Sequence, residues 1–183
     1  MQTSITADHK YPLFVPPLTL AGKDRKAWSA VEAKEYFTWL VTVAPSRVDH
    51  LLNFLNIARL PLNGELLDIA QVRLESSLSE GGFYRTESER RRLTDAGYAI
   101  AADMGLLVAT IAIASSSGKV KWETLRKPKS DASFNLPILK GFENDSVHFD
   151  PIQGSIACLA GIVNGKALPQ AWRRGLNFCL DSG

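Results

Sequence analysis

The sequence predicts an α+β protein that is mainly helical and has a small antiparallel sheet in its second half. Apolar residues recur at helical spacing over much of residues 29–112. Residues 119–126 then alternate polar and apolar side chains, which is the period of a half-buried strand. Helical patterns return from residue 150 onward. Helices and strands that are segregated in this way favour α+β over an alternating α/β fold.

Length and composition predict one domain spanning residues 1–183. Hydrophobic residues make up 45% of the chain and charged residues 22%, which is typical of a globular protein. A chain of this size buries about 70% of its unfolded surface and needs no disulfide or metal to fold. No internal repeat or low-complexity tract is present.

The first 27 residues are predicted to form an extended arm. Pro12, Pro16 and Pro17 lack a backbone N–H and restrict the residues before them, so the segment cannot continue as a helix. It also carries large apolar side chains. We expect the arm to pack along the body of the protein; the alternative is that it docks on a partner.

Three helices are predicted over residues 29–80. Ser29 and Glu32 have the spacing of a capping box, and Pro45 is expected to end the helix that they begin. Ser46 and Asp49 would open a short second helix. The third should run over residues 65–80, with Gly81-Gly82 after it.

A long fourth helix is predicted over residues 86–112, with Thr86 and Glu89 as its capping pair. Its first half is charged and its second half is apolar all round, which is typical of a buried central helix. Residues 108–113 are β-branched enough that a strand is the alternative.

The sheet is expected to come from residues 119–126 and 134–142, where Pro137 indicates an edge strand. Asp150-Pro151 then matches an N-cap followed by proline at the first helical position. This pattern predicts a helix that ends near Asn164-Gly165. A last helix should span about 169–180.

Charge and leader signals limit the partners and the compartment. Lys and Arg number 21 against 19 Asp and Glu, and acids interrupt both basic segments, so nucleic-acid binding is not expected. No signal-peptide pattern opens the chain. The longest uncharged apolar run, 104–114, is about half the ~20 residues of a membrane helix. We therefore expect a cytoplasmic protein without a membrane partner.

No catalytic or cofactor motif is present. The sequence has no phosphate-binding loop, no G-x-G-x-x-G and no G-x-S-x-G elbow. His9, His50 and His148 are far apart, and none has metal-ligand spacing. Cys158 and Cys179 have apolar neighbours and are expected to be buried free thiols. We predict no catalytic, cofactor or metal residues.

Asp103 and His148 are the residues that an enzyme would use. Asp103 interrupts the apolar half of the predicted long helix, where an unpaired buried carboxylate is costly. It is a general acid or base, one half of an internal ion pair for which Arg73 is a candidate partner, or a residue on a side of the helix that meets solvent. His148 and Asp150 are two apart and could form an acid–base pair. The simpler interpretation is that Asp150 caps the following helix.

Aromatic residues crowd the first predicted helix. Trp28, Tyr36, Phe37 and Trp39 cannot all lie on one narrow core-facing stripe. Either some of them are exposed anchors for a protein partner, or the N-terminal arm covers the outer side of the helix.

Residues 75–152 resemble a pattern found in uncharacterised bacterial proteins, some of which are similar to immunity proteins encoded beside secreted toxins. The matching segments are Glu75-Ser76-Ser77-Leu78, Ala101-Ala102-Asp103-Met104-Gly105, Lys121-Trp122-Glu123, Lys127-Pro128-Lys129, 135–142 and Asp150-Pro151. Gly81-Gly82 departs from the pattern. The resemblance implies a non-catalytic protein that binds and blocks a cognate toxin, and it assigns no functional residues. A small enzyme using Asp103 and His148, or a structural assembly subunit, is the alternative.

Overall fold

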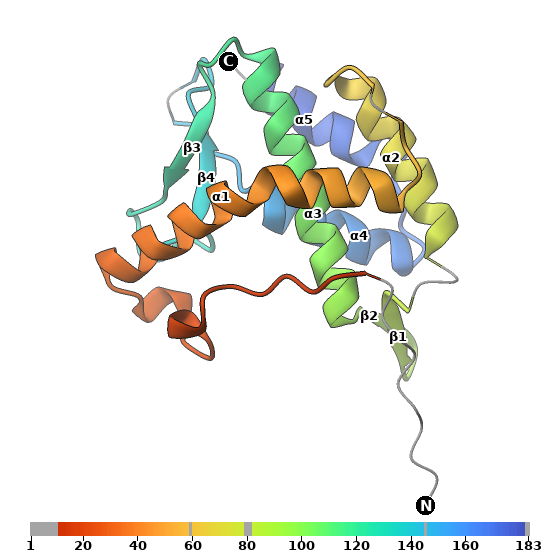
Figure 1. The fold of residues 1–183 in the computed structure, drawn as a ribbon, viewed down its shortest axis with the longest axis horizontal. Coiled ribbons are helices and arrows are strands. Elements are labelled where there is room, and N and C mark those ends of the chain that lie inside the picture. The colour runs from red at the N-terminus through yellow and green to blue at the C-terminus, as the bar shows by residue number, and fades with distance from the viewer. Residues whose placement is uncertain (1–10, 59, 79–81, 145, 182–183) are drawn as a thin grey trace, which may run out of the picture.

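The computed structural model describes residues 11–58, 60–78, 82–144 and 146–181. Within these residues the chain forms an α+β fold, as predicted, with five α-helices and two antiparallel hairpins. The elements are α1 (Ala30–Phe54), α2 (Gly64–Ser77), β1 (Tyr84–Glu87), β2 (Arg90–Leu93), α3 (Asp95–Ser115), β3 (Lys121–Thr124), β4 (Pro137–Lys140), α4 (Pro151–Val163) and α5 (Ala171–Asp181). Figure 1 shows α3 in the middle, with the other helices around it.

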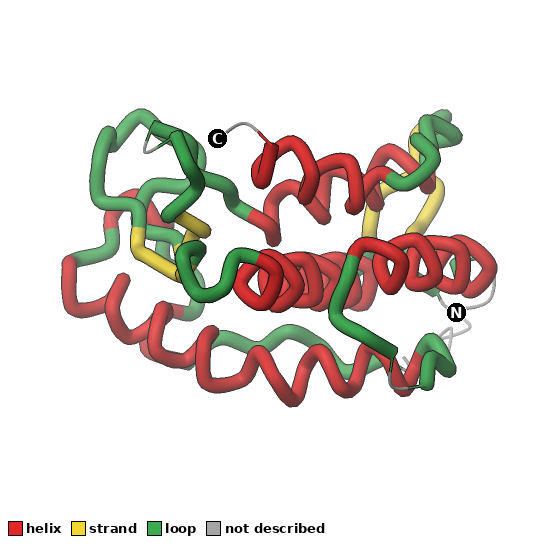
Figure 2. The backbone as a smooth tube through the Cα atoms, turned by 90° about the horizontal axis from the view of Figure 1, so that it is seen from above, coloured by secondary structure: helices red, strands yellow, loops and turns green. Residues whose placement is uncertain are grey.

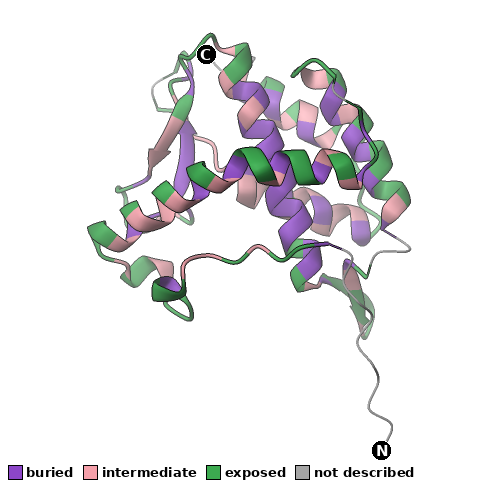
Figure 3. Ribbon diagram, viewed as in Figure 1, coloured by how far each residue is buried: buried purple, intermediate pink, exposed green. Residues whose placement is uncertain are grey.

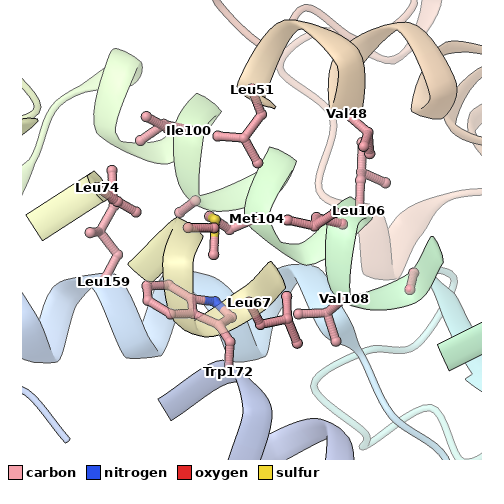
Figure 4. Close-up of a cluster of buried hydrophobic side chains, with 14 of the residues drawn as sticks. Val48, Leu51, Leu67, Leu74, Ile100, Met104, Leu106, Val108, Leu159 and Trp172 are labelled. Atoms are coloured by element: carbon pink, nitrogen blue, oxygen red, sulfur yellow. The ribbon is translucent and has the colours of Figure 1, made fainter. Parts of the chain in front are cut away.

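Helix α3 is the centre of the core. Fifteen of its residues are buried, on all of its sides, as expected for a helix that is apolar all round. Figure 4 shows side chains of all five helices meeting there, among them Leu51, Leu67, Met104, Leu159 and Trp172. By length and composition alone α3 could cross a membrane, and most of it lies buried among the other elements. The strand alternative for residues 108–113 is wrong.

Helix α1 is continuous through Pro45, so the predicted break into two helices is wrong. Pro45 is exposed and removes only its own N–H from the hydrogen-bond ladder. The turns on either side pack against α3 through Leu40, Val48 and other buried residues, and this packing holds the helix together. The Ser46 hydroxyl donates to the Val43 carbonyl within the helix instead of capping a new one.

The charged half of the predicted long helix is a β-hairpin, which corrects the range 86–112. Glu87 pairs with Arg90 across a two-residue turn, and Ser88 adopts a left-handed φ of 57°. Asn164 at the end of α4 binds the backbone N–H and C=O of Arg91 at 3.0 and 2.9 Å. This long-range contact and the hairpin ladder outweigh the local capping pattern. Helix α3 begins later, where Thr94 is the cap.

The later elements are confirmed close to their predicted positions. Strands β3 and β4 pair antiparallel, with Trp122 opposite Leu139. Phe149 adds a bridge to Leu139. Helix α4 begins at Pro151 after the Asp150 cap, and α5 occupies residues 171–181.

The arm lies beside α1 and runs antiparallel to it, as Figures 1 and 2 show. Tyr11 packs against Phe54 near the end of α1, with ring centroids 5.0 Å apart. Further along, Thr19 Oγ1 donates to Glu35 Oε1 at 2.6 Å, and Lys23 pairs with Glu32 at 2.5 Å, near the start of α1. Residues 11–27 therefore pack on the body, as predicted; residues 1–10 of the predicted arm lie outside the described residues.

The crossing of α3 and α4 depends on Gly105. A Cβ built there would lie 2.5 Å from the Pro151 carbonyl oxygen, whereas a Cβ at Gly175 in α5 meets nothing within 4 Å. We expect Gly105→Ala to lower the free energy of unfolding by about 1–3 kcal/mol through overpacking. Gly175→Ala should raise it by about 0.5–1 kcal/mol. Urea denaturation of both variants tests this, and equal effects would show that the two helices can move apart without cost.

Candidate functional site

Asp103 lies fully buried in α3 and forms an ion pair with Arg47 of α1. Arg47 Nε donates to Oδ1 at 2.8 Å and Nη2 donates to Oδ2 at 2.6 Å. The Tyr11 hydroxyl of the arm donates to Oδ2 at 2.5 Å. The ion-pair interpretation of Asp103 is confirmed, but the candidate partner Arg73 is wrong: Arg73 is exposed on α2. Periodicity could not identify Arg47, because the predicted break at Pro45 placed it in a different helix.

Arg47 also holds the arm. Its Nη1 donates to the Leu13 carbonyl at 3.2 Å and its Nη2 to the Pro12 carbonyl at 3.1 Å, while its guanidinium lies 5.4 Å from the Phe14 ring centre. Tyr11, Arg47 and Asp103 together form what we call the Asp103 cluster. Its hydrogen bonds join the arm, α1 and α3 at one point.

The Asp103 cluster is built to keep a charge buried. Burial raises the pKa of the Asp103 carboxyl, while the hydrogen bonds from Arg47 and Tyr11 favour its charged form. Burial and the neighbouring Asp103 carboxylate raise the pKa of the Tyr11 hydroxyl, so it remains a donor. Both carboxylate oxygens accept hydrogen bonds from the protein itself. Because both oxygens already have protein donors, Asp103 has a structural role and holds Arg47 and Tyr11 in place.

Removing the Tyr11 hydroxyl tests this structural role. We expect Tyr11→Phe to lower the free energy of unfolding by about 1.5–3 kcal/mol, the usual range for a hydrogen bond to a charged group. Tyr98→Phe is the control, because Tyr98 is half exposed and surface changes stay within about 0.5 kcal/mol. Chemical denaturation measures both variants. A neutral Tyr11→Phe would mean that Arg47 alone holds the carboxylate.

His148 and Asp150 do not pair with each other. Asp150 caps α4, accepting from the Gln153 N–H at 3.0 Å and from the Ser133 hydroxyl at 2.8 Å. His148 Nε2 lies 3.3 Å from Asp131 Oδ2. The capping interpretation of Asp150 is therefore confirmed. Burial raises the pKa of the Asp150 carboxyl, and the capping hydrogen bonds counteract part of that effect.

The arm covers much of the aromatic surface of α1, as one of the two interpretations expected. Phe14 packs edge-on against Trp39, with centroids 5.1 Å apart. Trp28, at the end of the arm, lies 5.2 Å from Tyr36. Burial raises the pKa of Tyr36 to about 12. The arm therefore packs against the aromatic residues that crowd α1.

Asn135 is a structural residue that the sequence did not single out for this role. It is fully buried and has a left-handed φ of 68°, which asparagine tolerates better than most residues. Its Nδ2 donates to the Arg25 carbonyl at 2.7 Å and to the Trp28 carbonyl at 3.1 Å. Arg126 donates to its Oδ1. Asn135 therefore fixes the end of the arm to the segment before β4.

Two tryptophans differ in how their indole N–H is satisfied. Trp172 Nε1 donates to Ser155 Oγ at 2.9 Å inside the core, whereas Trp28 Nε1 is buried without an acceptor among the residues that the structure describes. We expect Trp172→Phe to cost at least about 1 kcal/mol more than Trp28→Phe, because only the former leaves a buried hydroxyl without its donor. Thermal or urea unfolding of both compares them, and the reverse order would show that Trp28 has a partner.

Exposed apolar side chains gather where the arm meets α1. Leu18 is 85% exposed, Val31 75% and Val15 62%. Val41 of α1 is also exposed, and the outward side of α1 is green in Figure 3. We call the surface formed by Val15, Leu18, Val31 and Trp39 the arm–α1 face.

Neither the two thiols nor the possible metal ligands form a reactive or metal-binding site among the residues that the structure describes. Cys179 is buried and Cys158 partly so; burial raises the pKa of both thiols, that of Cys179 to about 11. Such thiols are weak nucleophiles at neutral pH. In the described ranges, no three His, Cys, Asp or Glu residues are grouped to hold a metal ion.

Comparisons with protein-family models, curated proteins and solved structures find no match for this chain.

Proposed function

We propose that this protein is a non-catalytic cytoplasmic binding protein that uses its arm–α1 face to dock on a protein partner. The observation that carries the proposal is the concentration of exposed Leu18, Val31 and Val15 on a surface that several contacts hold in place. Exposed apolar side chains rimmed by polar groups are typical of protein-interaction sites. An interface of ordinary size, about 800 Å² per partner, would extend beyond these residues.

The arm–α1 face is preorganised. The Asp103 cluster fixes one end of the arm, the Thr19–Glu35 and Lys23–Glu32 contacts fix its middle, and Asn135 fixes its end. A surface that is ordered before binding loses little conformational entropy on association. Lys34 and Glu35 lie on the same side of α1 as Val31, so recognition would combine apolar contact with charges of both signs.

The partner class is an expectation from the resemblance over residues 75–152: we propose an immunity-type inhibitor that blocks a cognate bacterial toxin. A net charge of +2 does not suit an inhibitor that imitates nucleic acid, so binding by shape and mixed polar contacts is the better account. The enzyme alternative is weakened because Asp103 is occupied by Arg47 and Tyr11, and His148 by Asp131.

Co-expression with the product of the adjacent gene tests the proposal. We expect a stable equimolar complex and relief of any toxicity of that product. Val31→Lys should weaken the complex by at least about tenfold, which is about 1.4 kcal/mol. Val72→Lys is the matched control, because Val72 is also an exposed helical valine, 63% exposed, on α2 away from the arm. Titration calorimetry measures both.

Three outcomes would contradict the proposal in different ways. Loss of binding in Val72→Lys but not in Val31→Lys would move the interface to α2. No complex and a harmless neighbour would remove the immunity role. Self-association of the chain alone, seen by light scattering and abolished by Val31→Lys, would make the arm–α1 face a contact of an assembly subunit.

A further inference from the structure

A pocket lies behind the turn that joins the arm to α1. Its volume is about 690 Å³, and it is lined by Pro16, residues 20–26 and Trp28 of the arm, by Tyr36 of α1, by the start of β4 and by the start of α4. This volume falls in the range of small-molecule sites, about 300–1,000 Å³. Four segments distant in sequence converge on it.

The walls of the pocket are fixed before any ligand binds. Asn135 holds the backbone of Arg25 and Trp28 at 2.7 and 3.1 Å. On the opposite side, Asp150 is held by the Gln153 N–H and the Ser133 hydroxyl. The pocket is therefore a built feature of the fold, positioned by partly buried hydrogen bonds.

Opposite charges line the pocket without joining. The guanidinium of Arg25 favours the ionised form of Asp150 through the field it creates, yet no hydrogen bond or ion pair connects their side chains among the described residues. The Asp150 oxygens accept hydrogen bonds from the Ser133 hydroxyl and the Gln153 N–H and also interact with the Ile152 N–H, which leaves one of their four lone-pair positions open. A cation and an anion are thus both available to one ligand.

The remaining lining combines apolar and aromatic side chains with Lys23, Asp24, Lys26 and Gln153. Leu20, Trp28, Tyr36, Pro137 and Ile152 contribute to it, and Trp28 and Tyr36 lie side by side with their ring centres 5.2 Å apart. The aromatic part of the lining suits an aliphatic or aromatic group, while Lys23 is already paired with Glu32 and the Asp24 carboxylate accepts from the Lys26 N–H. The ligand should therefore carry both charges at one end and an apolar group at the other.

We propose that this pocket binds a free α-amino acid with an apolar side chain. Its carboxylate would pair with Arg25, its ammonium group with Asp150, and its side chain would pack against Trp28 and Tyr36. A mononucleotide fits less well, because its phosphate would lie near the Asp150 carboxylate. The inference stands apart from the proposed protein-binding function, since the pocket lining contains no residue of the arm–α1 face.

Titration calorimetry of the full chain with leucine, phenylalanine and tryptophan tests the inference. We expect at least one of them to bind with a Kd of about 1 mM or tighter. For that amino acid, the carboxamide, which lacks the carboxylate, and the deaminated acid, which lacks the ammonium group, should each bind at least about tenfold more weakly. Both losses are required, because each analogue removes one of the two ion pairs.

Variants assign the binding to the pocket. Arg25→Gln and Asp150→Asn should each weaken binding by at least about tenfold, and asparagine retains the capping ability that α4 needs. Lys166→Gln is the control, because Lys166 is exposed and lies outside the pocket; it should bind like the unchanged protein. Circular dichroism confirms that each variant is folded.

Several results would overturn the inference. The first is that none of the three amino acids gives a heat of binding. The second is binding that neither Arg25→Gln nor Asp150→Asn weakens. The third is tighter binding of adenosine or uridine monophosphate than of any of the amino acids. The complex with a protein partner is measured separately, so failure here leaves the arm–α1 proposal intact, and failure there leaves this one intact.

Discussion

The carboxylate of Asp103 is the point on which the arrangement of arm, α1 and α3 depends. A charge fully buried in an apolar helix is stable only if it is paired and hydrogen-bonded, and Arg47 and Tyr11 supply both conditions. Arg47 can do so because α1 continues through Pro45, which places the Arg47 side chain next to Asp103 of α3. The same guanidinium then binds the arm backbone, so one ion pair sets the position of three segments.

The proposed surfaces both derive from this arrangement. An arm held along α1 leaves Leu18 and Val31 exposed on the outside and encloses a pocket on the inside, where it turns back toward the sheet and α4. Asn135 fixes the end of the arm that lines the pocket. The Asp103 cluster fixes the other end, from which the arm runs beside α1. A protein partner and a small ligand would therefore meet different sides of the same segment.

Features that depend on neighbouring residues were predictable from the sequence. The Ser29 and Asp150 caps, the strand around Trp122 and the central apolar helix all follow from local pattern. Features decided by distant contacts were not. The β1–β2 hairpin is tied to Asn164, Pro45 is overridden by packing on α3, and the partner of Asp103 comes from another helix. The exposure of Val31 on α1 likewise depends on tertiary packing, because periodicity does not show which of two apolar sides of a helix faces the core.

The link between Tyr11 and Asp103 spans 92 positions in the chain, and this separation has a consequence for the order of folding. While the protein is being synthesised, the arm emerges before α1 and α3, and its binding site is absent until the middle of α3 has left the ribosome. Contacts of such long sequence separation close late, because the loop entropy must be overcome before they form. The arm is thus made before both helices but is among the last segments to reach its native place, and α1 forms before the arm packs beside it.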